Sequence, residues 1–132
     1  MEYVPYIAIA LAFGLIYLPR QVVSLEMAKL EGGYDNSEPR SQQQKLDGLG
    51  RRALAAHHNS IEAFAPFAAG VLAAIQRGGN VRAAAILAIV FIAARGAYIY
   101  AYLADKASLR SGMWTLGIVA TSSLMILAII GR

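Results

Sequence analysis

The sequence contains no cysteine and only two histidines, His57 and His58. Without cysteine the chain can form no disulfide bond, no thiolate metal site and no cysteine nucleophile, and thiol usage gives no guide to its redox compartment. A zinc or iron site usually requires several cysteine or histidine ligands, which this chain does not supply. We therefore expect no metal, and we interpret His57 and His58 as packing or hydrogen-bonding residues rather than catalysts.

Charged residues are scarce as well. Asp, Glu, Lys and Arg make up 15% of the 132 residues, whereas hydrophobic residues make up 58%. Soluble domains have about a quarter charged residues and a little under half apolar residues. This composition is typical of a membrane protein, and the length of the chain predicts one small integral membrane domain over residues 1–132.

Long apolar stretches predict an all-α fold, an antiparallel bundle of four transmembrane helices. We place the helices at about residues 3–30, 48–76, 81–104 and 109–131, with a polar loop at about 31–47. The apolar run of the second helix covers only 63–75, which is too short to cross about 30 Å of hydrocarbon at about 1.5 Å per residue. The second helix must therefore begin among the polar residues upstream of this run. The connections after the second helix are short, so neighbouring helices run antiparallel. The sequence has no internal repeat, and we therefore do not expect a transporter built from two inverted halves.

The distribution of basic residues predicts the orientation in the membrane. Most of them lie in or beside the 31–47 loop and the last connection, whereas Arg77, Arg82 and Arg132 lie at the opposite ends of the helices. By the positive-inside rule, the long loop faces the cytoplasm and both termini face the other side. The net charge of +4 fits this topology and contact with anionic membrane lipids. No nucleic-acid-binding motif accompanies it, so nucleic acid is not an expected partner.

Two lines of polar residues interrupt the second and third predicted helices. Residues seven apart on a helix return to within about 20° of each other, so Arg52 and Asn59 share a face, as do Arg95 and Tyr102. Ionisable side chains inside a membrane helix are costly unless they pair, face water or bind a polar ligand. The predicted binding set is Arg52, Asn59, Glu62, Arg95, Tyr98 and Tyr102, and Arg110 and Ser111 open the fourth helix at the same depth. Guanidinium, carboxylate, amide and phenol groups together suit a small zwitterionic peptide.

Structural interpretations of the same residues stay open. An ion pair between Arg95 and Glu62 that only fixes helix packing is one alternative, because a paired charge is tolerated in a bundle interior. Tyr100 points away from the polar line and is typical of an interfacial aromatic belt. Pro66 is expected to kink the second helix.

The segment from Arg52 to Phe67, which contains Asn59-x-x-Glu62, is followed by Arg95-x-x-Tyr98-x-x-x-Tyr102 and by Arg110-Ser111. In order, spacing and position, this combination resembles the MAPEG family, the membrane-associated proteins in eicosanoid and glutathione metabolism. The loop segment 33–40 is similar to the bacterial, uncharacterised branch of that family.

The resemblance implies a homotrimer of four-helix subunits, in which glutathione binds between neighbouring protomers near the cytoplasmic face. It implies that the six residues of the predicted binding set hold glutathione as a co-substrate. It further implies that Arg110 is the catalytic, thiol-activating arginine, since a nearby positive charge stabilises a thiolate, and that Ser111 can donate a hydrogen bond to the sulfur. A lipophilic small-molecule substrate would reach this site from the bilayer.

The function that follows from the resemblance is a glutathione-dependent membrane transferase or peroxidase that acts on lipophilic electrophiles or lipid hydroperoxides. We expect it in a bacterial inner membrane with the active site towards the cytoplasm. One alternative is a non-catalytic lipid-binding or scaffold protein of the same fold, and another is a purely structural or channel-like bundle. The sequence leaves open the substrate, the thiol and the pathway, and whether Arg20, Lys29 or Arg40 touches the ligand.

Overall fold

Four long helices and one short helix make up most of residues 1–131. The computed structural model describes residues 1–131, and Arg132, one of the basic residues used to predict orientation, lies outside the described residues. The helices are α1 (Val4–Ala28), α2 (Pro39–Gln43), α3 (Gly48–Gln76), α4 (Val81–Leu103) and α5 (Ala107–Ile130). Across residues 1–131 there is no strand, which agrees with the predicted all-α class.

Three of the helices, α1, α4 and α5, are long and apolar enough to cross a membrane. Helix α3 has 29 residues, which gives a length of roughly 43 Å at about 1.5 Å per residue. Its first half carries Arg51, Arg52 and Glu62. By composition, α3 is not apolar enough to count with α1, α4 and α5 as a candidate membrane span. Membrane-spanning helices are therefore supported for three of the four predicted spans.

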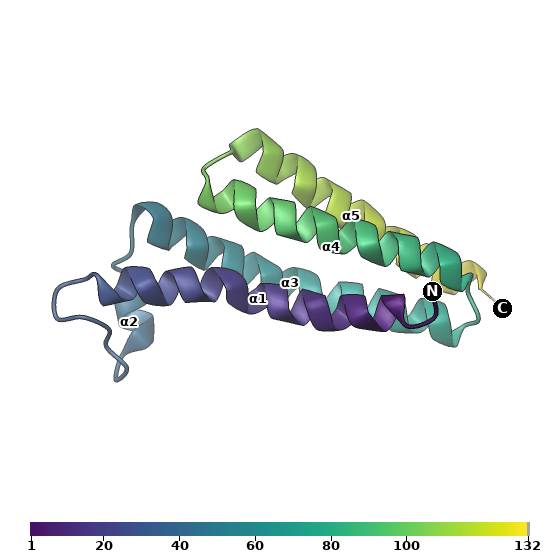
Figure 1. Ribbon diagram of the computed structural model, residues 1–132, viewed down its shortest axis with the longest axis horizontal. Coiled ribbons are helices and arrows are strands. Elements are labelled where there is room, and N and C mark those ends of the chain that lie inside the picture. The colour runs from purple at the N-terminus through teal and green to yellow at the C-terminus, as the bar shows by residue number, and fades with distance from the viewer. Residues whose placement is uncertain (132) are drawn as a thin grey trace.

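The long helices pack as two pairs. Figure 1 shows α1 running beside α3 and α4 beside α5, with both termini at one end of the molecule and the α1–α3 connection at the other. At the centre, the ring of Phe67 on α3 stacks on Phe91 of α4, with centroids 3.7 Å apart and planes 3° from parallel. A Cβ atom at Gly70 would lie 3.2 Å from Leu124 Cβ, so a small residue lets α3 and α5 approach closely there.

The polar connection between α1 and α3 is folded rather than open. The sequence predicts a loop at about 31–47, whereas the structure contains the short helix α2, which starts at a proline. Gln42 is buried and ties this segment to the end of α1. Its Nε2 donates to the Gly33 carbonyl at 2.6 Å, and its Oε1 accepts from the backbone N–H of Asp35 at 3.0 Å. A five-residue helix without an apolar period gives no sequence signal of its own.

Helix α1 is joined to α3 by a histidine. His57 Nδ1 lies 2.8 Å from the backbone oxygen of Ile16. A carbonyl only accepts hydrogen bonds, so His57 must carry its proton on Nδ1 and donate it. The contact lies close to Pro19, which has no N–H for the helical ladder of α1. The predicted hydrogen-bonding role of His57 is confirmed.

Candidate functional site

A buried guanidinium joins α3 to α4. Arg95 is only 4% exposed, and its Nη1 donates to Asn59 Oδ1 at 3.0 Å while Nη2 donates to Ser60 Oγ at 3.2 Å. Ser60 in turn donates to the Ala56 carbonyl at 2.8 Å, so the oxygen lone pairs of this hydroxyl are left for Arg95. The guanidinium carbon also lies 4.2 Å from the ring centroid of Tyr98. These charge-assisted and cation–π contacts offset the cost of burying Arg95.

The alternative ion pair between Arg95 and Glu62 is not present among residues 1–131. Glu62 is exposed on α3 and accepts a hydrogen bond from Asn59 Nδ2 at 3.3 Å. Asn59 therefore stands between the carboxylate and the guanidinium, with its oxygen towards Arg95 and its nitrogen towards Glu62. The positive charge of Arg95 is held by neutral oxygens and an aromatic ring, and no described carboxylate neutralises it.

A cleft of about 410 Å³ lies between α3, α4 and the start of α5. The ring of Tyr98 meets Tyr102 edge to face, with centroids 5.5 Å apart, and the guanidinium carbon of Arg110 lies 4.6 Å from the Tyr102 centroid. The two phenols thus lie between two guanidinium groups, one from α4 and one from α5. The cleft is lined by Asn59, Tyr98, Tyr102, Arg110, Ser111, Trp114 and Thr115.

Five of the eight predicted site residues line this cleft, and Arg95 supports it through Asn59 and Tyr98. The structure does not bring Arg52 or Glu62 into the lining. Arg52 Nη2 donates to the Leu103 carbonyl at the end of α4, at 3.4 Å, and Nη1 lies 3.9 Å from Asp105 Oδ2. Asp105 has a φ of 57° in the turn before α5, a conformation that aspartate tolerates better than most residues. In the single chain, Arg52 therefore fixes this turn instead of facing the cleft.

The structure adds three residues that the sequence analysis missed: Ser60, Trp114 and Thr115. Ser60 is adjacent to Asn59 and belongs to neither polar line, so spacing alone could not identify it. Trp114 and Thr115 follow Arg110 and Ser111 at a spacing of four residues, which places them on the same face of α5. That spacing was a usable signal within a helix that otherwise looks uniformly apolar.

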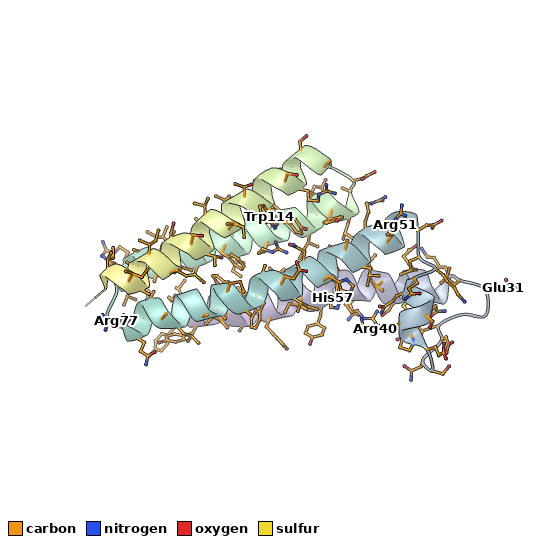
Figure 2. The ribbon with its side chains drawn as sticks, turned by 180° about the vertical axis from the view of Figure 1, so that it is seen from behind. Glu31, Arg40, Arg51, His57, Arg77 and Trp114 are labelled. Atoms are coloured by element: carbon orange, nitrogen blue, oxygen red, sulfur yellow. The ribbon has the colours of Figure 1, made fainter. Side chains whose placement is uncertain are left out.

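A second cavity, which we call the apolar groove, adjoins the cleft at Trp114. It has a volume of about 240 Å³ and runs along α5 against α3 and α4. Figure 2 shows Trp114 on α5, between the end of the molecule where Arg51 lies and the end where Arg77 lies. Trp114 lines both cavities, so the groove and the cleft are neighbours along α5. The groove is lined by Ala63, Pro66, Phe91, Arg95, Trp114, Gly117, Ile118, Thr121, Ser122 and Met125.

Comparison with protein families identifies the family of the chain. The model of the MAPEG family matches residues 4–130, which is essentially the whole chain. No curated protein matches the sequence. The match confirms the family resemblance that Asn59-x-x-Glu62 and Arg95-x-x-Tyr98 indicate.

Proposed function

The chain belongs to the MAPEG family, and on this premise we propose that it is a glutathione-dependent membrane transferase or peroxidase acting on lipophilic electrophiles or lipid hydroperoxides. Family membership and the three apolar helices support an integral membrane protein of the family that is named for eicosanoid and glutathione metabolism. Glutathione is the proposed co-substrate.

One observation carries the proposal: a polar cleft that contains a guanidinium and a hydroxyl lies beside an apolar groove, and Trp114 lines both. Glutathione is polar and anionic, whereas its co-substrates here would be lipophilic. A site for both needs a polar and an apolar compartment that meet where the sulfur reacts. Trp114 marks that meeting point, and Arg110 and Ser111 lie one turn before it along α5.

The proposed chemistry is activation of the glutathione thiol. The positive charge of Arg110 favours the thiolate over the thiol, and the Ser111 hydroxyl can donate a hydrogen bond to the sulfur. In the transferase reaction, the thiolate forms a carbon–sulfur bond to the electrophile, and the displaced group leaves with its bonding electron pair. Arg110 is partly exposed in the cleft, so it can approach a ligand without breaking a buried ion pair.

We further propose that α3 is the fourth span and that three chains assemble around shared glutathione sites. Arg52 and Glu62 support this assembly, because both lie on α3 outside the cleft and keep exposed surface that a ligand between two protomers could reach. The proposed location is a bacterial inner membrane with the cleft towards the cytoplasm. Arg40 and Arg51 lie at the loop end of the molecule in Figure 2, as the positive-inside rule requires for a cytoplasmic loop.

A non-catalytic lipid-binding protein is the second candidate function. A second apolar cavity of about 280 Å³, lined by residues such as Ile7, Leu11 and Ile89, lies between α1 and α4, far from Arg110 in the sequence and without charged lining residues. Such a surface suits an acyl chain whether or not the chain has an activated thiol site.

An activity assay distinguishes the enzyme from the non-catalytic lipid-binding protein. The purified protein is assayed with glutathione and, in turn, an aryl halide and an organic hydroperoxide, beside Arg110→Ala and the control Arg77→Ala at the opposite end of the molecule. The enzyme proposal expects activity that Arg110→Ala loses and Arg77→Ala retains. Equal activity in both variants would contradict the role of Arg110, and saturable lipid binding without turnover in the wild type would favour the second candidate.

A further inference from the structure

The turn between α4 and α5 carries an aspartate where its backbone favours glycine. Asp105 has a φ of 57°, in the left-handed region. The backbone N–H of Lys106 bonds the Ala101 carbonyl at 2.8 Å, and that of Asp105 bonds the Tyr102 carbonyl at 3.2 Å, which is the Schellman pattern that usually has glycine at this position. Helix α3 ends in the same pattern with Gly78, whose φ is 71°. The turn alone therefore does not account for the aspartate at 105.

The carboxylate of Asp105 lies beside Arg52 of α3. Its Oδ2 is 3.9 Å from Arg52 Nη1, and the Asp105 side chain is 70% exposed whereas that of Arg52 is 30% exposed. Arg52 Nη2 donates to the Leu103 carbonyl at 3.4 Å, and Arg52 Nε is buried without a hydrogen-bond partner among residues 1–131. An unpaired buried donor is unfavourable, and an exposed ion pair is weak. The guanidinium is therefore held by contacts that a stronger acceptor can replace.

Arg52 lies at the edge of the cleft. Leu103, whose carbonyl it contacts, follows Tyr102 of the cleft lining, and Asn59 of the lining lies seven residues after Arg52 on the same face of α3. A carboxylate binds arginine most strongly through two N–H donors at once. Because Nε is buried, the available pair is Nη1 and Nη2, and Nη1 faces Asp105. A ligand carboxylate that takes this pair must displace Asp105.

We propose that Asp105 is a positioning residue that competes with the carboxylate of the ligand for Arg52. Its negative charge keeps Arg52 at the α4–α5 turn, and binding of a thiol that carries a carboxylate exchanges this partner for the ligand. Asp105 thereby lowers the affinity of the cleft for acidic thiols. The use of Arg52 by glutathione rests on the proposed function, whereas the contact between Arg52 and Asp105 rests on the geometry alone.

Calorimetric titration of the purified protein with glutathione tests the competition. Asp105→Asn removes the charge, and asparagine tolerates the left-handed backbone. It should tighten glutathione binding about two- to fivefold, which corresponds to about 0.4–1 kcal/mol. In an Arg52→Ala background the same substitution should give no gain, which a merely structural role of the turn does not predict. The control Glu31→Gln removes an equal charge from an exposed residue at the loop end (Figure 2) and should leave the affinity unchanged.

A second measurement needs no ligand. Phenylglyoxal modifies arginine side chains, and peptide mass spectrometry gives the rate at each one. Asp105→Asn should speed the modification of Arg52, since its partner is weakened, while the exposed neighbour Arg51 serves as the internal control. Asp105→Gly, which places the usual residue in this turn, should behave like Asp105→Asn and replaces it if that variant does not fold.

The outcomes separate this proposal from the proposed function. An equal rate of Arg52 modification in the wild type and both Asp105 variants would overturn the proposal. So would a wild type that binds glutathione as tightly as the variants do, or a gain in affinity that persists without Arg52. Glutathione that binds neither the wild type nor the variants would remove the proposed function and with it the competition, while faster modification of Arg52 would still confirm that Asp105 holds it.

Discussion

Replacing Ser60 by alanine should destabilise the protein by about 1.5–3 kcal/mol, the usual contribution of a hydrogen bond to a charged group. The hydroxyl accepts from Arg95 Nη2 at 3.2 Å, and the two residues are 5% and 4% exposed, so the lost partner lies away from bulk water. Asn59 would remain as the second acceptor at 3.0 Å. Because this hydrogen bond remains, the expected loss in the free energy of unfolding stays below the cost of a fully unpaired buried charge.

A double-mutant cycle isolates this interaction. Arg95→Met removes the charge but keeps a long apolar side chain, and it leaves the Ser60 hydroxyl without its donor. If the hydrogen bond acts as the geometry indicates, Ser60→Ala should cost much less in the Arg95→Met background, with a coupling free energy of about 1.5–3 kcal/mol. Reversible unfolding in mixed detergent micelles, followed by Trp114 fluorescence, gives the free energies of unfolding.

The matched control is Ser108→Ala, at an exposed serine near the start of α5, which should change the free energy of unfolding by less than about 0.5 kcal/mol. A coupling below about 0.5 kcal/mol, the ordinary deviation from additivity, would refute the claim that Ser60 holds Arg95.

Further predictions concern the thiol, the rim of the cleft and the loop. Arg110→Ala should raise the pKa of bound glutathione thiol by about two to three units, since charges about 4 Å apart at an effective dielectric constant of about 20 interact by about 4 kcal/mol; a pH titration of thiolate absorbance measures this, and an unchanged pKa would contradict it. Glu62→Gln should weaken glutathione binding in calorimetry by up to about tenfold if the exposed carboxylate pairs with the ligand ammonium, whereas equal affinity would leave Glu62 only its hydrogen bond with Asn59. Hydrogen bonds from the Ser37 hydroxyl and backbone N–H hold the pKa of Asp35 below its usual value of 3.8. Because the pKa of Asp35 is lower in the folded loop than in the unfolded chain, ionised Asp35 stabilises the folded loop above the unfolded pKa, and this stabilisation is lost as the pH falls through the folded pKa. Ser37→Ala should therefore raise the pKa of Asp35 in a carboxyl NMR titration. An unchanged pKa would contradict the contribution of Ser37.

Helical periodicity predicted the long helices and much of the site. The seven-residue spacing of polar residues placed Asn59 on the face of α3 that meets α4, and it placed Tyr102 near Arg95 on α4. Both sets do meet in the structure. This worked because a regular helix fixes the direction of each side chain from residue number alone.

Two features depended on tertiary contacts that periodicity does not contain. Arg52 shares a face with Asn59, yet the free carbonyl of Leu103 and the turn at Asp105 draw its side chain to the end of α4. Ser60 became important only because Arg95 of another helix reaches its hydroxyl.

The most direct test of the central claim is an ultraviolet thiolate difference spectrum of the purified, detergent-solubilised protein, titrated with glutathione at neutral pH beside Arg110→Ala. Size measurement in the same detergent shows that the variant keeps the wild-type assembly. We expect a saturable thiolate signal in the wild type that the variant loses. A wild type without thiolate signal, or a variant that gives the same signal, would contradict an arginine-activated thiol site in this cleft.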